Sequence, residues 1–266
     1  MDLQRHFNYN PHLELTVAQM GVNKWQWDKV ERFDENLAKR IMALNRYDIL
    51  PIKHNGVVEY YFHTLERGDF SKIDHKKIVM ADTIYYRLSF RDLLRKMMKE
   101  KKDYYFLSDG QDTLGFISIN DLNSLPVYNY VYQLIATIER EVSSYLSFIL
   151  NEEEVIEILQ KTSDKQAKDV LAHFNSQKLK NAENTIFQYL FFPTLGTLLK
   201  YAEPKIKKDK PKLLDYRKEF CSGNLYWEIR NIVSHPVNPL FTDAESIEKV
   251  NRLIVEYVEI MEILRE

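Results

Sequence analysis

Apolar residues recur at helical intervals over residues 34–46 and predict an amphipathic helix there. The residues concerned are Leu37, Ile41, Met42 and Leu44. A short apolar run from Ile49 to Ile52 follows this helix and is typical of a strand. The turn-forming pair Asn55-Gly56 comes next, and together with residues 57–62 it predicts a β-hairpin.

The same order of elements recurs about 56 residues later. A second amphipathic helix is predicted around residues 90–98, with Phe90, Leu93, Leu94, Met97 and Met98 on its apolar face. A strand at 104–107, the turn Asp109-Gly110 and a return strand at 114–119 complete the second copy. The front half of the chain is therefore predicted to hold two copies of one α/β supersecondary unit.

Beyond Pro126 the hydrophobic pattern is helical throughout. One long helix is predicted from a stripe of apolar residues, which are Val131, Leu134, Ile135, Ile138, Val142, Tyr145, Leu146 and Ile149. Further helices are predicted around residues 152–160, 181–201, 213–234 and 244–264. We predict an α+β unit over residues 1–126, followed by an all-α bundle of four or five helices over residues 127–266.

Charge and composition narrow the functional classes. The 37 basic and 39 acidic residues leave a net charge of −2, so no global field holds nucleic acid, and an RNA contact needs a local patch. Cys221 is the only cysteine, which excludes an intrachain disulfide and thiolate-rich zinc sites. The histidines show no metal-ligand spacing, and no Walker or Rossmann glycine motif is present. Without a signal-like start or an apolar run of ~20 residues, we expect a cytoplasmic protein that does not bind membranes.

The strongest motif of the front half is Gly115-Phe116-Ile117-Ser118-Ile119-Asn120-Asp121-Leu122, where a predicted strand leads into a helix. A carboxylate at Asp121 can accept hydrogen bonds from both hydroxyls of a ribose. Ser118 and the first amides of the helix can donate to a phosphate. Phe116 and Ile117 are apolar and are expected to line the space for a base.

This segment resembles the Gly-x-hydrophobic-Ser/Thr-x-x-Asp signature of CBS domains, and the repeat over residues from about 20 to 125 adds to the resemblance. CBS domains pack as tandem repeats that bind adenosine-containing ligands in clefts between the copies. The resemblance implies a ligand such as AMP or ATP, acting as a regulator, at Ser118, Asp121 and Ile117. The positions aligned in the first copy, Phe62 and Leu65, are apolar, which predicts at most one well-formed site. The alternative is that Ser118 and Asp121 only cap the next helix.

The back half contains Arg230, Asn231 and His235, with four residues between the arginine and the histidine. This pattern resembles the Arg-polar-x-x-x-His motif of HEPN domains, which are helical bundles, often homodimeric, and in many cases metal-independent endoribonucleases whose cleft both subunits build. The resemblance implies a homodimer that cuts RNA without a catalytic cofactor. Glu139, Arg140 and Glu141, on the long helix, are further candidates for the cleft, although a solvated face is the simpler interpretation for most of them.

The chemistry of RNA cleavage gives these residues their expected roles. His235 can help to deprotonate the 2′-hydroxyl, Arg230 can hold the phosphate, and Asn231 can position either the phosphate or the imidazole. Five residues of ideal helix leave Arg230 and His235 about 140° apart, so we expect Pro236 to turn His235 out of helical geometry. The alternative is that both side chains only satisfy the end of a helix.

Three hypotheses follow for the whole chain. In the first it is an adenosine-ligand-regulated ribonuclease, a stress or defence effector, with the basic run Lys205 to Lys212 in a loop that either holds RNA or acts as a solvated linker. In the second it is a non-catalytic nucleotide sensor whose helical half dimerises or docks a partner protein. In the third the helical half is a scaffold and both motifs are caps.

Overall fold

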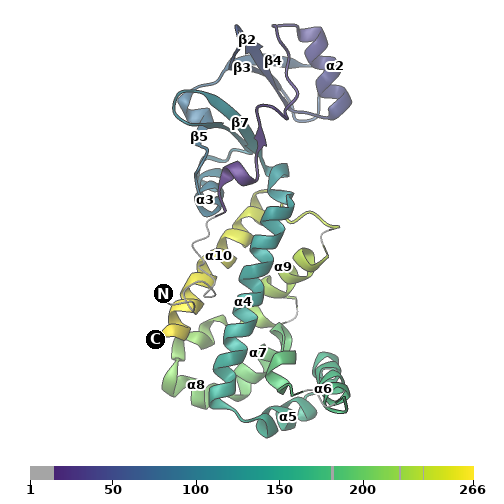
Figure 1. Ribbon diagram of the computed structural model, residues 1–266, viewed down its shortest axis with the longest axis vertical. Coiled ribbons are helices and arrows are strands. Elements are labelled where there is room, and N and C mark those ends of the chain that lie inside the picture. The colour runs from purple at the N-terminus through teal and green to yellow at the C-terminus, as the bar shows by residue number, and fades with distance from the viewer. Residues whose placement is uncertain (1–14, 181–182, 222, 236) are drawn as a thin grey trace. The chain divides into compact units, whose positions relative to one another are not determined.

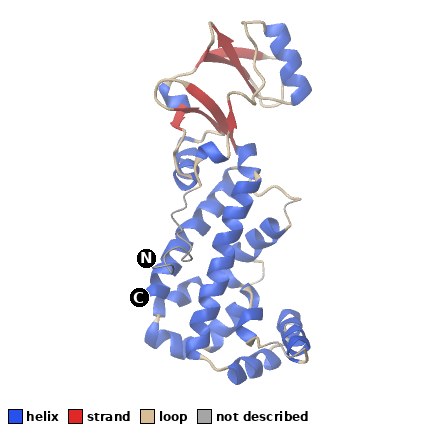
Figure 2. Cartoon of the chain, viewed as in Figure 1, coloured by secondary structure: helices blue, strands red, loops and turns tan. Residues whose placement is uncertain are grey.

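The computed structural model describes residues 15–180, 183–221, 223–235 and 237–266. Two compact units divide the chain (Figure 1). The first runs from the start of the described residues to Val127 and includes Phe241–Ala244, and the second contains Tyr128–Leu240 and Glu245–Glu266. The strands belong to the first unit, and the described part of the second consists of helices and loops (Figure 2). No helix in these ranges is long and apolar enough to span a bilayer.

The first repeat follows the predicted order. Helix α2 (Glu35–Asn45) begins after Asp34, whose carboxylate accepts a hydrogen bond from the backbone N–H of Leu37. Strands β2 (Ile49–His54) and β3 (Val57–Thr64) form the predicted hairpin. Asn55 and Gly56 turn the chain with φ of 51° and 86°, as a two-residue hairpin turn requires.

The buried face of α2 differs from the predicted one. Ala38 and Met42 are fully buried, whereas Leu37 and Leu44 are 43% and 84% exposed. The core beneath the helix contains Leu50, Ile52, Phe62 and Ile73. The small side chain of Ala38 occupies the inner face of α2, which leaves the larger leucines on the solvent side.

The second repeat agrees with the sequence pattern more closely. Strand β5 (Thr83–Tyr85) leads to α3 (Phe90–Glu100), and β6 (Tyr104–Ser108) and β7 (Thr113–Ser118) form the hairpin. The predicted apolar face of α3 is buried at Phe90, Leu93, Leu94 and Met97. Strand β5 pairs in parallel with β6, and a parallel bridge between Val30 and Ile52 is its counterpart in the first repeat.

The two repeats are related by a shift of 55 residues. Both helices end at a left-handed residue, Arg46 and Lys101. The backbone N–H of Thr64 donates to Asp48 O at 3.0 Å, and that of Ile119 donates to Asp103 O at 2.8 Å. The strand register also shifts at the same place in both hairpins, between Ile52 and Lys53 and between Leu107 and Ser108. These matches correct the spacing of about 56 residues and place His63 and Glu66, not Phe62 and Leu65, opposite Ser118 and Asp121.

Each repeat contributes its leading strand to the sheet of the other. Strand β1 (Val22–Asn23) precedes the first repeat but pairs with β7, and β4 (Ile73–Lys77) precedes the second repeat but pairs with β3. The sheet orders are therefore β1-β7-β6-β5 and β2-β3-β4. Gly115 lets β1 lie against β7, because a Cβ atom at this position would lie only 2.4 Å from Val22 O.

Aromatic side chains fill the space between the two sheets. Trp27, Tyr61 and Phe106 are buried together, with Phe116 packed against them. The rings of Tyr61 and Phe106 have centroids 5.0 Å apart, which joins β3 of the first repeat to β6 of the second. The repeats therefore share one hydrophobic cluster in addition to the exchanged strands.

The second unit is built on the predicted long helix α4 (Leu125–Ile149), whose apolar stripe is buried from Val131 to Leu146. Within the described ranges it contains more helices than the four or five predicted. After α4 they are α5 (Glu152–Lys161), α6 (Lys165–Lys178), α7 (Phe192–Tyr201), α8 (Glu203–Asp209), α9 (Leu225–Ser234) and α10 (Ala244–Arg265), with 3-10 helices at Ile186–Tyr189 and Pro211–Phe220.

The basic run was wrongly predicted to be a loop. Most of it lies in α8, where Pro204 stands in the first turn and Ile206 is fully buried. Lys205 pairs with Glu154 at 2.8 Å, and Lys207 pairs with Glu203 at 2.6 Å. Two of the cations considered for RNA binding, in a segment that was also considered as a solvated linker, are therefore engaged by carboxylates.

Candidate functional site

A cavity of about 530 Å³ lies in the first unit, and its walls come from matching positions of the two repeats. The matched residues are Arg46 and Lys101, Tyr47 and Lys102, Asp48 and Asp103, Ile49 and Tyr104, His63 and Ser118, and Thr64 and Ile119. Trp27, Asp28, Phe116 and Asp121 also line it. The sequence motif and its counterpart in the first repeat therefore face one shared space.

The Ser118–Asp121 corner has the geometry of a capping box. Both the backbone N–H and the hydroxyl of Ser118 donate to Asp121 Oδ2, each at 2.7 Å. The cap begins a short 3-10 helix, Ile119–Asn123. Burial raises the pKa of Asp121, and the hydrogen bonds from Ser118 oppose that rise. The corner thus has the geometry of the capping interpretation, and the Ser118 hydroxyl already donates its proton to Asp121.

Ile117, the third residue predicted to bind the ligand, lies in the core. Its side chain is fully buried and is not part of the cavity wall. The neighbouring Phe116 lines the cavity instead. The reason is the alternation of a strand, because consecutive residues of β7 face opposite sides.

The matching corner of the first repeat is polar as well. His63 Nδ1 donates to Thr64 O at 3.0 Å, since a carbonyl can only accept. The carboxylate of Asp48 accepts from the Thr64 hydroxyl at 3.0 Å and from the backbone N–H of Gly68 at 2.9 Å. The expectation of an apolar counterpart resulted from a one-residue error of alignment, which exchanges the two faces of a strand.

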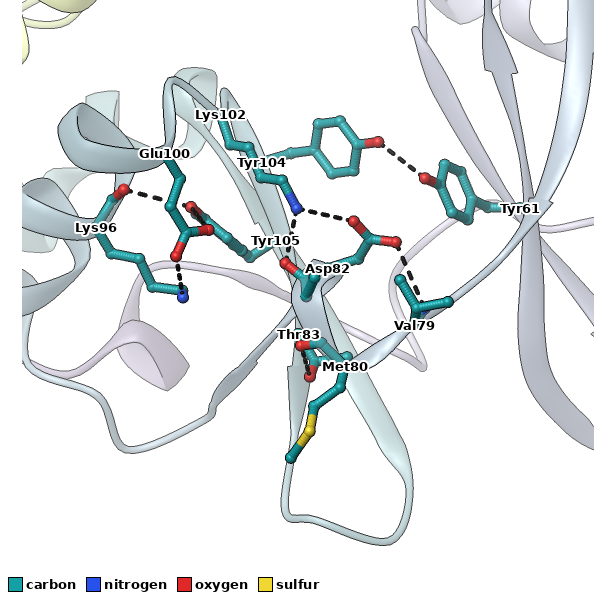
Figure 3. Close-up of polar contacts among 11 residues, drawn as sticks. Tyr61, Val79, Met80, Asp82, Thr83, Lys96, Glu100, Lys102, Tyr104 and Tyr105 are labelled. Atoms are coloured by element: carbon teal, nitrogen blue, oxygen red, sulfur yellow. Dashed lines mark hydrogen bonds and ion pairs between the residues drawn. The ribbon is translucent and has the colours of Figure 1, made fainter.

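Hydrogen bonds hold one wall of the cavity to the segment that connects the repeats (Figure 3). Lys102 Nζ donates to Ala81 O at 2.7 Å and to Asp82 Oδ1 at 2.9 Å. The hydroxyls of Tyr104 and Tyr61 lie 3.0 Å apart and link the two sheets. Burial is the main cause of the raised pKa of both tyrosines, so both stay neutral hydrogen-bonding groups.

The three residues of the second motif lie at the end of α9. Helix α9 ends at Ser234, and His235 has left helical geometry with φ of −134° and ψ of 74°. The His235 side chain is exposed, and Asn231 is partly buried. Pro236, to which we attributed this turn, lies outside the described residues.

Two aromatic rings lie near the guanidinium of Arg230. Its guanidinium lies 6.0 Å from the ring centroids of both Phe191 and Trp227. In the part of the chain that the structure describes, it makes no hydrogen bond or ion pair. The two rings are themselves stacked, with centroids 6.4 Å apart. Arg230 is therefore held by packing and keeps its hydrogen-bond donors.

Glu139 of α4 lies close enough to Arg230 for the charge of the arginine to affect the pKa of the carboxyl group. It accepts a hydrogen bond from the backbone N–H of Phe192 at 3.1 Å. Burial raises the pKa of Glu139, and both this hydrogen bond and the charge of Arg230 oppose the rise. Glu139 is thus a largely buried neighbour of the motif rather than a solvated residue, whereas Arg140 and Glu141 are more exposed and pair with each other at 2.9 Å.

No group of three or more His, Cys, Asp or Glu side chains in the described ranges is placed to hold a metal ion. The wall residues that the sequence interpretation missed include Trp27, Arg46 and Lys101. Aligning the repeats on Arg46-Tyr47-Asp48 and Lys101-Lys102-Asp103 finds the last two, because a basic residue stands two places before an aspartate in both. Trp27 carries no such signal.

Comparison with known proteins gives little further guidance. No protein-family model and no curated protein matches the chain. Among solved structures, the chain is similar to a hemolysin-like protein containing a CBS domain, from Oenococcus oeni PSU. The two are 15% identical over 45% of this chain and 93% of that chain, with a TM-score of 0.32.

Proposed function

We propose that the first unit is a sensor that binds an adenosine-containing ligand in the cavity between its repeats. The observation that carries this proposal is a cavity of about 530 Å³ lined by matching positions of both repeats, with Asp121 in its wall. Such a volume suits a nucleotide-sized ligand. The resemblance of Gly115 to Leu122 to the CBS signature, together with the duplicated unit, supports adenosine as the ligand class.

Asp121 is the residue expected to recognise the ribose. Ser118 uses only Oδ2, so Oδ1 can accept from a ribose hydroxyl without breaking the cap. Hydroxyl donors would also favour the ionised carboxylate over the neutral one, against the effect of burial. Because the Ser118 hydroxyl donates to Asp121, we assign contact with a phosphate to the basic residues of the wall instead.

The test replaces Asp121 by Ala and measures AMP and ATP binding by calorimetry. Loss of a charged acceptor should weaken binding roughly ten- to a hundredfold. Asp92→Ala is the matched control, because Asp92 accepts from the Ser89 hydroxyl at 2.8 Å in an equivalent cap but does not line the cavity. Equal affinities in Asp121→Ala and the wild type would reject the site. A similar loss of affinity in Asp92→Ala would mean that both variants weaken binding by disturbing the fold.

The simplest output of such a sensor is non-catalytic. In that form the second unit dimerises or docks a partner protein, and the ligand changes the strength of that association. Light scattering at micromolar concentration, with and without AMP, tests the homodimer directly. A chain that stays monomeric in both conditions would exclude dimerisation as the output and leave docking of a partner protein.

We also propose a second function for the second unit, which is cleavage of RNA without a metal ion. It is favoured by the exposed side chain of His235, which has left the helix, and by the unpaired guanidinium of Arg230 among the described residues. His235 would serve as the base and Arg230 would stabilise the charge on the phosphorane.

The test is incubation of RNA with the protein in chelator. RNA should be cut to a 2′,3′-cyclic phosphate, and DNA should survive because it has no 2′-hydroxyl. His235→Ala should lower the rate roughly a hundredfold, whereas His54→Ala, a change at another exposed histidine, should not. Intact RNA after incubation with a ligand-saturated dimer would leave the non-catalytic sensor as the function.

A further inference from the structure

The wall of the cavity carries equal numbers of positive and negative side chains. The cations are Arg46, Arg67, Lys101 and Lys102, and the carboxylates are Asp28, Asp48, Asp103 and Asp121. A cleft lined mainly by cations attracts a polyphosphate, because charges of one sign focus the field within the cleft. How these eight groups are paired therefore decides how much negative charge a ligand can bring.

Two of the four cations have carboxylate partners. Arg67 lies between the two matching aspartates, 3.9 Å from Asp48 Oδ2 and 3.7 Å from Asp103 Oδ2. Lys102 pairs with Asp82, which does not itself line the cavity, and also donates to Ala81 O (Figure 3). Asp82 is 17% exposed, so water screens this pair less than a pair at the surface.

The other two cations, Arg46 and Lys101, have no ion pair in the described part of the chain. They are matching residues of the two repeats, and each ends a helix in left-handed geometry with φ of 56° and 52°. Glycine is the usual residue at such a position, because a side chain there costs about 1 kcal/mol or more. Both repeats thus accept backbone strain to place a long basic side chain at the cavity. A favourable interaction with the helix dipole is the competing explanation.

We infer that the cavity selects a nucleotide with a single phosphate monoester, whose charge Arg46 and Lys101 balance, and disfavours the triphosphate. The inference rests on the proposed function of the first unit. A monoester carries a charge of about −1.5 to −2 at neutral pH, which two cations match. A triphosphate brings more negative charge, whereas the remaining cations are paired with Asp48, Asp103 and Asp82. Asp28 and Asp121 add negative charge to the wall, and neither has an ion pair in the described part of the chain.

The experiment compares AMP, ADP and ATP by calorimetry in chelator at one ionic strength, with GMP and GTP as a second series. AMP should bind more tightly than ATP, and Arg46→Gln and Lys101→Gln should each weaken AMP binding roughly three- to tenfold. Unchanged AMP affinity in both variants, with lowered thermal stability, would assign these residues to the helix ends and overturn the inference.

A charge variant tests the selection from the opposite side. Asp82→Asn releases Lys102 while its side-chain oxygen can still accept a hydrogen bond, so it should raise ATP affinity roughly three- to tenfold and AMP affinity less. Asp112→Asn, which removes an exposed carboxylate of the same unit outside the cavity, is the control and should change neither. An equal gain for both nucleotides, or an equal effect of the control, would contradict a local charge limit.

The two proposals fail in different ways. If ATP binds as tightly as AMP or more tightly in the wild type, the charge inference is wrong and the sensor proposal stands. If GMP binds in preference to GTP and no adenosine nucleotide binds, the adenosine assignment is wrong and the charge inference stands. If no nucleotide binds at millimolar concentration, both are rejected.

Discussion

The two motif-bearing sites differ in what surrounds their polar groups. Asp121 faces an open cavity, and Ser118 uses only one of its carboxylate oxygens. Arg230 instead lies against two aromatic rings, and its charge lowers the pKa of Glu139 against the effect of burial. Similar sequence signals thus lead to different physical situations. At the first site space and hydrogen-bonding capacity remain for a ligand, whereas at the second site packing holds the arginine and only its donors remain.

The largest expected effect concerns the close approach of β1 to β7 in the first unit. In Gly115→Ala the new methyl group would meet Val22 O at 2.4 Å, a backbone atom that cannot move without breaking the pairing of β1 with β7. We expect a loss of stability of roughly 1–3 kcal/mol, confined to the first unit. Hydrogen exchange should show faster exchange in β7 and unchanged protection in α4.

Gly196→Ala is the matched control in the second unit. Its added methyl group would meet the Phe220 Cβ at 3.2 Å, a side-chain atom, and alanine favours the helix in which it stands. We expect a smaller change in stability. Equal losses in the two variants would remove the contrast between a unit that depends on one close backbone approach and a unit built from packed helices.

A double-mutant cycle between Glu139 and Arg230 should give an intermediate effect. Glu139→Gln and Arg230→Met each remove one charge, and Arg230→Met leaves a largely buried carboxylate uncompensated. We expect the double variant to be more stable than the sum of the single losses predicts, by roughly 0.5–2 kcal/mol, in urea unfolding followed by circular dichroism. Additive losses would mean that Arg230 does not compensate Glu139 and stays fully available to an RNA phosphate.

The smallest effect is a dependence on pH. Burial raises the pKa of Glu139 above its ordinary value of 4.5, so the folded chain holds that proton more tightly than the unfolded chain. The stability of the wild type relative to Glu139→Gln should therefore fall as pH rises from about 4.5 through the folded pKa, and then level off. Melting temperatures of both proteins across this range measure it, and a difference that grows with pH would have the wrong sign.

The sequence predicted the elements of the first unit well where the pattern was local. The turns Asn55-Gly56 and Asp109-Gly110 and the apolar face of α3 are confirmed. Strand β4 was missed because only Ile73 in it is buried, so it carries no alternating pattern. Strand β1 is two residues long and is defined by its partner β7, which lies far away in the sequence.

The errors in predicting the candidate site came from misplacing residues by one position along a strand. A shift of one residue in the repeat alignment replaced His63 by Phe62 and so removed a polar corner. The same alternation placed Ile117 in the core and Phe116 at the cavity. In the second unit, the density of lysines in the basic run suggested a loop, while the buried Ile206 and the proline in the first turn decided for a helix. Pairings that fix register are long-range, and a single sequence does not display them.

The exchange of β1 and β4 makes the first unit behave as two complementing fragments. If the chain is cut at the exposed loop around Gly68, the first piece keeps β1, β2 and β3, and the second keeps β4 to β7. Each piece then holds the outer strand of the other's sheet and has one sheet edge of its own uncovered. Mixing the two pieces should restore the fold that neither reaches alone. A single copy of the repeat would therefore leave its leading strand unpaired unless a second copy supplied the sheet.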